Sequence, residues 1–411
     1  MKIVVFTLGC KVNACESQAL IKGFSDLGYE VSEELSYADI YVINTCAVTK
    51  EAEKKSRQAV ARVKKFNPNA KIIITGCASQ RDGKSFIDKG GVTLVTGTSS
   101  KEKILDLVLE SGCFIAEPET YYHELPIPKT EKARAFIKVQ DGCNNFCSYC
   151  IIPYLRGRSR SRSPESVKLE IETLNPLEAV LTAINLSAYN FEGVDLCGLI
   201  SALKGVKTRI RLGSLEENVI SNKFLTELSN LYDFAPHFHL SLQSGSDKTL
   251  KDMKRKYDTE AFMQGVKLIR EYFPTAGITT DVIVGYPTET KEDFNASVSF
   301  IEKIEFSDVH VFMYSPREGT LSYKLKDLPP EIKKARLDRM LAVKDKLKSS
   351  FISKNLGVEH KVIIEEYDGK YSLGYTANYI KVYIDKKLKE GKYDVVLISS
   401  LSDGALAKIK E

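Results

Sequence analysis

The sequence predicts an α/β protein with an N-terminal open parallel sheet, a central partial α/β barrel and a small C-terminal β-barrel. Its 411 residues exceed the usual size of one domain, so two or three domains are expected. Short β-branched runs alternate with helical segments through most of the chain, which is typical of βαβ units around parallel strands. The last part of the chain is instead rich in strand signals separated by turn residues.

The first predicted domain spans residues 1–115. Strands are expected at 3–10, 39–46 and 71–77, with helices at 17–29 and 51–66. Each strand ends in a cysteine, namely Cys10, Cys46 and Cys77. Because the carboxyl ends of parallel strands meet at one edge of a sheet, we expect these three thiols to form a shared ligand set.

A proline-containing linker at 116–132 is predicted to lead into the central domain, 133–350. Strands are expected within 135–140, 178–185, 207–215, 237–245, 277–287 and 307–316, and helices within 259–273 and 291–304. Repeated βα units favour a complete or partial α/β barrel, whose functional groups lie at the carboxyl ends of its strands.

The C-terminal part begins with a long basic helix that opens at Pro329-Pro330 and stops near Gly357. Its predicted apolar stripe consists of Met340, Val343, Leu347 and Phe351. Strand-like runs within 360–367, 371–384 and 393–400 then predict a small β-barrel over 354–411, a kind of domain that often binds nucleic acid.

Charge, cysteine count and the length of apolar runs indicate the cellular location that we expect for the chain. The net charge of +5 decides nothing about partners, and nine cysteines are too few and odd in number for a disulfide scaffold. The apolar run at 3–8 is shorter than that of a signal peptide, and no run approaches a membrane span. We therefore expect a cytoplasmic chain without membrane association, whose reduced thiols can bind metal.

The strongest local motif is CxxxCxxC, formed by Cys143, Cys147 and Cys150 after a predicted strand. These thiolates can bind three irons of one cluster and leave the fourth iron open. Structural zinc wants a fourth ligand, and no histidine or cysteine follows closely. A zinc knuckle or an inert loop is the less favoured alternative.

This motif, with Tyr149 before its last cysteine, resembles the radical S-adenosylmethionine superfamily. Three cysteines on an upstream α/β domain and a terminal β-barrel narrow the resemblance to the methylthiotransferases. The matching segments are TLGCKVNACES, NTCAVTKEAEKKSRQ, TGCASQ, QDGCNNFCSYCIIPYLRGRSRSR, HLSLQSGSDKTLKDMKRKY and GYTANY. Lys11-Val12-Asn13 and Asn144-Asn145-Phe146 are most similar to the branch that modifies threonylcarbamoyladenosine at position 37 of tRNA.

The resemblance implies a radical S-adenosylmethionine type of barrel, a TRAM-like terminal barrel and two 4Fe-4S clusters. Cys143, Cys147 and Cys150 would hold the cluster that binds S-adenosylmethionine, and Cys10, Cys46 and Cys77 a second cluster that carries sulfur. Two S-adenosylmethionine molecules would then serve to replace the C2 hydrogen of the base by methylthio. Implied partners are the tRNA anticodon stem-loop and an electron donor of flavodoxin or ferredoxin type. No catalytic residue beyond the cluster ligands is expected, because the cofactors carry the hard chemistry.

Eight residues are predicted to contact S-adenosylmethionine. They are Tyr149, Ser187, Arg211, Ser214, Gln243, Ser244, Asp281 and Tyr314. For Gln243 and Ser244, a turn that caps the next helix is an equal alternative. Nearby loops depart from the family pattern at Gly213, Glu217 and Thr288 and in NLSAYNFEG.

Contacts to RNA are predicted for two further groups. Arg156, Arg158, Arg160 and Arg162 form a predicted phosphate-binding strip, with a plain solvated charge run as the alternative. Tyr375 and Tyr379 are predicted to contact RNA from the terminal barrel, unless that barrel is purely structural. His237 and His239 are expected to make hydrogen bonds inside the barrel rather than to bind metal. Cys15, Cys113 and Cys197 are expected to be buried small side chains without a ligand role.

Two groups of alternative functions stay open at this point. Within the family, the substrate could instead be isopentenyladenosine in tRNA or an aspartate of a ribosomal protein. From a different class, the chain could be a non-catalytic zinc-bearing RNA-binding protein.

Overall fold

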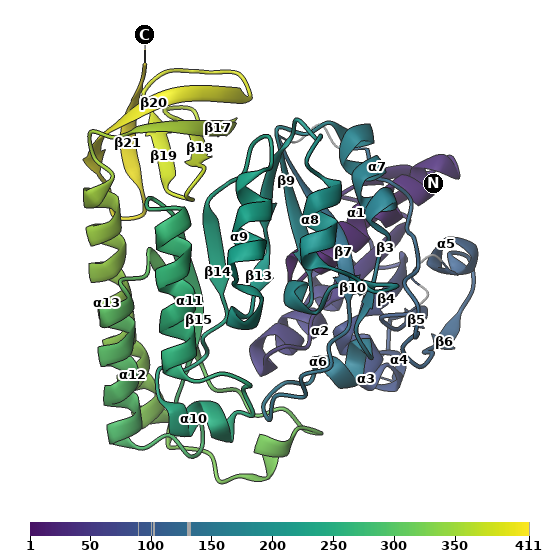
Figure 1. Cartoon of the computed structure of the whole chain (residues 1–411). Helices are drawn as coiled ribbons and strands as arrows, with labels where there is room; N and C mark the ends of the chain where they lie inside the picture. The colour runs from purple at the N-terminus through teal and green to yellow at the C-terminus, as the bar shows by residue number, and fades with distance from the viewer. Residues whose placement is uncertain (89, 100, 102, 130–132, 411) are drawn as a thin grey trace.

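The computed structural model of the protein describes residues 1–88, 90–99, 101, 103–129 and 133–410 (Figure 1). The last positions of the predicted linker, 130–132, and the final residue of the predicted terminal domain, 411, lie outside the described residues. Figure 1 shows an N-terminal α/β body in purple and blue, a central α/β body in teal and green, and a small yellow barrel carried at the end of a long helix. Among the described residues, no helix is both long and apolar enough to cross a bilayer.

The N-terminal sheet has six parallel strands in the order β2-β1-β3-β4-β5-β6. They are β1 (Lys2–Thr7), β2 (Glu30–Ser32), β3 (Ile40–Thr45), β4 (Lys71–Gly76), β5 (Leu94–Thr96) and β6 (Gly112–Phe114). The helices are α1 (Lys11–Asp26), α2 (Lys50–Lys64), α3 (Cys77–Asp82), α4 (Lys84–Asp88) and α5 (Lys103–Leu107). Since β1, β3 and β4 are neighbours, the three predicted cysteine-bearing strand ends lie at one edge of the sheet.

Helix α1 begins earlier than the sequence predicts, at Lys11 rather than at residue 17. Its first residues include Lys11, Asn13 and Glu16, which are polar and interrupt the apolar pattern that marks a helix. Asn13 and Glu16 are nevertheless buried, because the start of α1 faces polar groups of the central domain rather than an apolar core.

The central domain is a partial barrel, as predicted, built from two four-stranded sheets in the orders β12-β9-β7-β8 and β13-β14-β15-β16. An isolated bridge between Ile210 and Phe234 links the two sheets. The strands are β7 (Arg134–Asp141), β8 (Arg160–Ser161), β9 (Glu178–Ala183), β12 (Arg209–Leu212), β13 (Ser214–Leu215), β14 (His237–Leu240), β15 (Gly277–Val284) and β16 (Asp308–Met313), with a separate hairpin of β10 (Asn190–Phe191) and β11 (Val194–Asp195).

Helices cover the outer face of this barrel (Figure 1). They are α7 (Pro164–Leu174), α8 (Leu196–Ala202), α9 (Asn222–Ser229), α11 (Thr259–Tyr272) and α12 (Lys291–Ile304). Helix α10 (Asp247–Asp252) follows β14, and α6 (Ile152–Arg156) packs against α3 of the N-terminal domain. Alternate strand residues such as Ile137 and Val139 pack against the covering helices in one core. Because side chains alternate along a strand, residues such as Phe136 and Lys138 point to the barrel interior. The interior row is therefore free to be polar.

Helix α13 (Pro330–Lys354) starts with a proline in its first turn, as predicted. Met340, Val343 and Leu347 pack into the central core, whereas Phe351 packs against the core of the terminal barrel. That barrel is closed, in the order β17-β18-β19-β21-β20. Its strands are β17 (Glu359–Tyr367), β18 (Ser372–Thr376), β19 (Lys381–Ile384), β20 (Gly391–Ser400) and β21 (Ala405–Ile409).

Candidate active site

All six predicted ligand cysteines line one cavity of about 440 Å³ between the N-terminal sheet and the mouth of the barrel. One wall carries Cys10, Cys46 and Cys77 from the edge of the parallel sheet, and another carries Cys143, Cys147 and Cys150 from the loop after β7. All of them are free thiols. The cavity therefore brings together two sets of cysteines that are far apart in the sequence.

Close backbone packing holds the first set in place. Gly9 has φ +105°, and a Cβ added there would lie 2.8 Å from the Cβ of Cys46. The Asn13 amide donates to the carbonyl oxygens of Leu8, at 2.7 Å, and Thr45, at 3.0 Å. It thereby fastens the loop of Cys10 to the loop of Cys46.

Burial, and to a smaller degree the neighbouring thiols of Cys77 and Cys10, raises the pKa of Cys46 to about 11. A bound cation would reverse this preference, because metal ions bind thiolates. The mutual effect of these thiols also shows that the three side chains share one electrostatic environment.

The second set sits on a loop that also requires a glycine. Gly142 has φ +71°, and a Cβ there would lie 2.0 Å from the carbonyl oxygen of Arg158. Ser148 fixes the middle of the loop, since its N–H donates to Met253 O at 3.0 Å. Burial raises the pKa of Cys150 to about 12. The guanidinium of Arg255 donates to Cys147 Sγ at 3.2 Å and thereby fixes the position of this side chain.

The donor chemistry of each set fits an iron–sulfur cluster. Each set offers three thiols, so one iron of a four-iron cluster would keep a position without a protein ligand. Both sets line the same cavity, so clusters held by these cysteines would share that space. Such an arrangement can hold a small ligand between two reactive centres.

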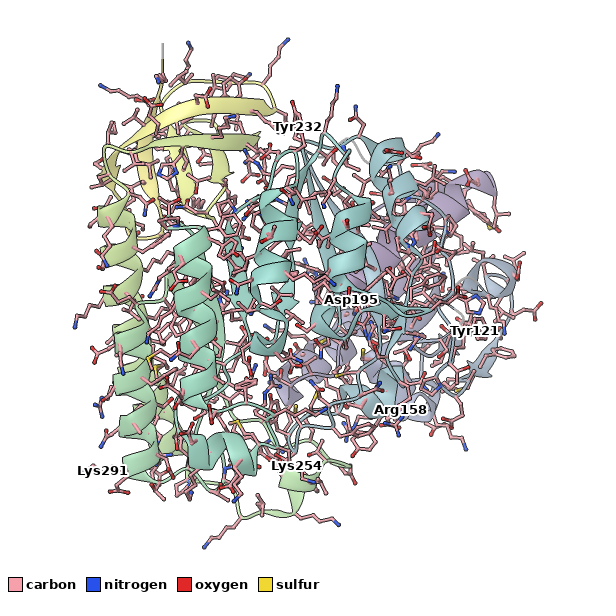
Figure 2. The ribbon with its side chains drawn as sticks, viewed as in Figure 1. Tyr121, Arg158, Asp195, Tyr232, Lys254 and Lys291 are labelled. Atoms are coloured by element: carbon pink, nitrogen blue, oxygen red, sulfur yellow. The ribbon has the colours of Figure 1, made fainter. Side chains whose placement is uncertain are left out.

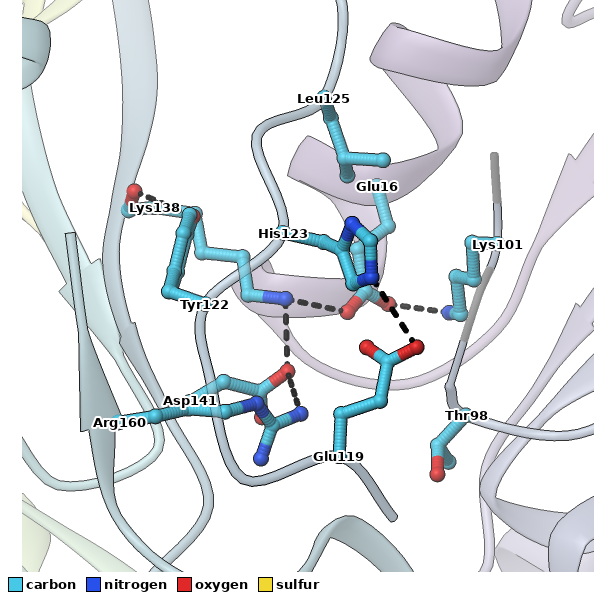
Figure 3. Close-up of a pocket in the computed structure, with 10 residues that line it drawn as sticks. All are labelled: Glu16, Thr98, Lys101, Glu119, Tyr122, His123, Leu125, Lys138, Asp141 and Arg160. Carbon is cyan, nitrogen blue, oxygen red and sulfur yellow. Dashed lines mark hydrogen bonds and ion pairs between the residues drawn. The ribbon is translucent and has the colours of Figure 1, made fainter. Parts of the chain in front are cut away.

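A buried ion network joins the two walls. Arg156 Nη1 lies 2.9 Å from Glu16 Oε1 on α1 and 3.1 Å from Asp141 Oδ1 at the end of β7. Lys138 and Lys101 bind the same Glu16 carboxylate (Figure 3). Arg156 also hydrogen-bonds to Cys77 and, with its charge, opposes the rise in the pKa of that thiol that burial causes. The network thus reaches Cys77 of the first set and Asp141, two residues before Cys143 of the second set.

The prediction of a surface strip of four arginines is wrong for three of them. Arg156, Arg160 and Arg162 are buried, with 0%, 8% and 5% of their surface exposed. Arg160 pairs with Asp141, as Figure 3 shows, and Arg162 pairs with Glu170. Buried guanidinium groups need such carboxylate partners, and these carboxylates leave no face for RNA phosphates.

Arg158 is the exposed member of the four. Its guanidinium lies 4.5 Å from the centre of the Phe146 ring, which packs edge-on against Tyr154. Figure 2 shows Arg158 on the outer surface of the molecule. The cation and the half-exposed Tyr154 form a small surface patch directly beside the second cysteine loop.

The eight residues predicted to contact S-adenosylmethionine divide into two groups. Those that line the cavity are Tyr149, Ser214, Gln243, Asp281 and Tyr314. Ser187 does not line it, and its hydroxyl instead accepts from the N–H of Glu216 at 2.8 Å. Ser244 is buried and accepts from Ser246 N, which is the turn that the alternative interpretation described.

Arg211 does not line the cavity, in contrast to its predicted contact with S-adenosylmethionine. It pairs with Glu178 at 2.7 Å and donates to the carbonyl oxygens of Thr376 and Ala377 in the terminal barrel. Its position on β12 suggested a ligand contact, but the side chain joins two domains. The guanidinium group of an arginine can donate hydrogen bonds to several acceptors at once, which suits a buried contact between two domains.

Tyr375 and Tyr379 are also used inside the protein. Tyr379 stacks on His237, with ring centres 4.5 Å apart, and on Tyr375, at 4.8 Å. Arg134 lies over both tyrosine rings. These contacts agree with the alternative of a structural role, and because both rings are partly exposed, their contact with RNA stays a prediction.

The histidines make the expected hydrogen bonds inside the barrel. His237 Nε2 and His239 Nδ1 each lie 2.9 Å from Thr279 Oγ1. His239 Nε2 also lies 3.2 Å from Asp281 Oδ2, and His310 stands beside them on β16. Ligand atoms of His239, Asp281 and His310 lie within 4.8 Å of one another.

Sequence reasoning missed a polar network at the barrel mouth. Glu216 accepts from the amides of Asn145, at 2.8 Å, and Asn185, at 3.2 Å, and pairs with Arg255 at 2.6 Å. All four side chains line the cavity. The signal available was position alone, because Asn185 and Glu216 follow predicted strands.

The rim of the cavity joins β16 to α2. Lys50 N donates to Ser315 Oγ at 3.1 Å, and Glu53 Oε2 lies 2.7 Å from Arg317 Nη2 and 2.5 Å from Arg81 Nη1. Strand β16 is the last strand of its sheet. Side chains rather than backbone pairing therefore close this side.

Known proteins share both the sequence and the fold. Residues 2–97 match the family described as "Uncharacterized protein family UPF0004", and residues 137–301 match the "Radical SAM superfamily". The threonylcarbamoyladenosine tRNA methylthiotransferase MtaB of Bacillus subtilis is 37% identical over 407 residues, which cover 93% of this chain and 90% of that protein. The chain belongs to the radical S-adenosylmethionine methylthiotransferase family.

Two further known proteins are similar to this chain. The tRNA-2-methylthio-N(6)-dimethylallyladenosine synthase of Endomicrobium trichonymphae is 32% identical over 94% of both chains. The solved structure of the radical S-adenosylmethionine methyltransferase TsrM from Kitasatospora setae has a TM-score of 0.58 at 13% identity, covering 90% of this chain and 79% of that one. That likeness concerns the fold.

Membership establishes the class of activity. The protein is a methylthiotransferase that uses S-adenosylmethionine and 4Fe-4S clusters. The alternative of a non-catalytic zinc-bearing protein is therefore wrong.

Replacing Gly9 with alanine should remove the cluster of the first cysteine set. The new Cβ would collide with Cys46 and strain a left-handed residue. Iron and sulfide analysis after anaerobic reconstitution should show a fall from about eight to about four irons per chain. Gly28→Ala is the matched control, because its φ is +83° but nothing lies within 4 Å of the added Cβ. Equal iron contents in both variants would contradict this account.

Replacing Arg156 with methionine should destabilise the fold by about 3–5 kcal/mol, because Glu16 and Asp141 each lose one of their buried cationic partners. Urea unfolding, followed by circular dichroism, measures the loss. Arg158→Met, at the exposed position of the same segment, should change stability by less than about 0.5 kcal/mol. Similar losses for the two variants would show that the buried network does not carry this stability.

Proposed function

We propose that the protein transfers a methylthio group to C2 of N6-threonylcarbamoyladenosine at position 37 of tRNA. The observation that carries the proposal is the single cavity lined by both cysteine sets, which is suited to a reaction needing two clusters at one substrate. The choice of base rests on the higher identity to the threonylcarbamoyladenosine enzyme of Bacillus subtilis, 37%, than to the dimethylallyladenosine enzyme of Endomicrobium trichonymphae, 32%.

We assign the two clusters to the two cysteine sets. Cys143, Cys147 and Cys150 would hold the cluster that binds S-adenosylmethionine, and Cys10, Cys46 and Cys77 the cluster that carries sulfur. When bound, these groups supply hydrogen abstraction and the methylthio group. The protein contributes position and shielding, since an aromatic C–H offers no acidic proton to a protein base.

The chain's own residues would orient the ligands in three ways. Arg255 holds Cys147 and Glu216 together and so fixes the loop against the barrel mouth. Gln243, which follows β14, offers an acceptor to the amino group or ribose of S-adenosylmethionine. Tyr149 and Tyr314 form an apolar wall that excludes water from the reacting atoms.

The proposed RNA-binding face is the patch of Arg158 and Tyr154. An exposed guanidinium can bind a phosphate, and a half-exposed ring can stack on a base. The patch adjoins the loop of Cys143, so RNA bound there would bring a base to the cavity. The domain division into 1–115, 116–132, 133–350 and 354–411, a cytoplasmic location and a flavodoxin- or ferredoxin-type electron donor complete the proposal.

Nucleoside mass spectrometry of tRNA from a deletion strain tests the substrate. The methylthio derivative of threonylcarbamoyladenosine should disappear, while its unmethylthiolated precursor accumulates. Complementation with the intact gene should restore the derivative, and complementation with a Cys147→Ala variant should not. Loss of the methylthio mark from dimethylallyladenosine instead would assign the chain to the other tRNA branch.

Replacing Arg158 with alanine should weaken binding of the anticodon stem-loop and flatten its salt dependence. The loss of one phosphate contact reduces the slope of log K against log salt by about 0.7 to 0.9. Fluorescence anisotropy at several salt concentrations measures it, and iron content should not change. Lys291→Ala is the control, because Lys291 is exposed and lies far from Arg158 in Figure 2. An unaltered slope for Arg158→Ala would exclude this contact.

A further inference from the structure

Among the residues that the structure describes, one cation of the barrel interior, Lys11, has no carboxylate within ion-pair distance. Lys11 directly follows Cys10 and opens helix α1, which crosses the inner side of the barrel. On this helix Cys15 Sγ lies 3.3 Å from the carbonyl oxygen of Phe136, and Lys11 Nζ lies 5.8 Å from the centre of the Phe136 ring. Phe136 belongs to the interior row of β7. The ammonium group therefore reaches the interior of the barrel, where its side chain is still accessible to solvent.

The other cations at this level are neutralised. Arg134 lies 2.8 Å from Glu178 and 2.7 Å from Glu365, and Arg211 lies 2.7 Å from Glu178. In the part of the chain that the structure describes, no carboxylate lies within 4.0 Å of Lys11 Nζ. Lys11 is thus the cation of this region that is open to an anionic ligand.

A polar wall formed by Asp281, His239 and His310 lies within electrostatic range of Lys11. Against the effect of burial, the hydrogen bond from His239 and the charges of His239, His310 and Lys11 lower the pKa of Asp281. Asp281 lines the same cavity as the six cysteines, so this wall is continuous with the active site. Both nitrogens of His239 already have partners, Thr279 and Asp281. A metal ion would have to displace these contacts, whereas an organic ligand could use the free oxygen of Asp281 and the exposed His310.

The substrate base has the complementary shape. In an adenine, C2 and N6 lie on the same edge, on either side of N1. A base that presents C2 to the space between the cysteine sets therefore turns its N6 substituent toward the adjoining wall. A threonylcarbamoyl group carries a carboxylate, a hydroxyl and N–H donors, whereas a dimethylallyl group carries none of these.

We propose that Lys11 binds the carboxylate of the N6 substituent and thereby selects threonylcarbamoyladenosine over uncharged N6 derivatives. Asp281 accepts a hydrogen bond from an N–H or hydroxyl of the same substituent. This inference rests on the proposed function, which it extends by naming the group that sets substrate choice. A neutral substituent would leave the ammonium group partly desolvated without a partner.

The test compares two RNA probes of one sequence. Both are anticodon stem-loops with threonylcarbamoyladenosine at position 37, one with the free carboxylate and one with its methyl ester. Dissociation constants are measured by fluorescence anisotropy on reconstituted enzyme with S-adenosylmethionine. A charged hydrogen bond corresponds to about a ten- to hundredfold preference for the free acid in the wild-type protein.

Substitutions in α1 then test whether Lys11 causes this preference for the free acid. Lys11→Gln should bring the ratio of the two dissociation constants to near one by weakening binding of the acid alone. Lys11→Arg should keep most of the preference. Lys22→Gln, on the same helix but paired with Asp26, should behave like wild type. Iron analysis of each variant verifies that both clusters are present.

Three results would overturn the inference. Discrimination in Lys11→Gln equal to wild type, or a wild-type protein that binds acid and ester equally, overturns it while threonylcarbamoyladenosine remains the substrate. A protein that modifies dimethylallyladenosine RNA and leaves threonylcarbamoyladenosine RNA unmodified overturns the proposed function together with it.

Discussion

The guanidinium group of Arg156 is the interaction on which the rest of the site depends. It is fully buried and pairs with Glu16 from the N-terminal domain and Asp141 from the barrel. Charges removed from water are tolerated when they are paired and hydrogen-bonded, so the position of each partner is fixed by the others. The two domains therefore meet in one arrangement, and the two cysteine sets face each other across one cavity.

Because side chains alternate along the barrel strands, the interior of the barrel can be polar while the outer face of the same strands is apolar. Outward residues such as Ile137 and Leu181 pack with the helices in a continuous core, which supplies the stability. Inward residues such as Asp281 and His239 are then available for ligands. In this protein, stability and chemistry are assigned to opposite faces of the same strands.

The sequence predicted the parts of the site that follow from local pattern. Cys10, Cys46 and Cys77 come after strong apolar runs, and the edge rule for parallel strands brings them together. Short strands such as β2, β5 and β6 carry too few residues to show a period. The sequence also could not reveal which arginines are buried, because Glu16, the partner of Arg156, lies 140 residues away. Likewise, nothing local to Tyr379 indicates that its ring stacks on His237.

The edge position of β16 determines how this side of the barrel is closed. On its far side, the barrel is joined to α2 by Glu53, Arg81 and Arg317 rather than by a ladder of backbone hydrogen bonds. Ion pairs between side chains can change partners without breaking a backbone hydrogen bond. This side of the cavity can therefore alter its shape while both sheets of the barrel stay intact.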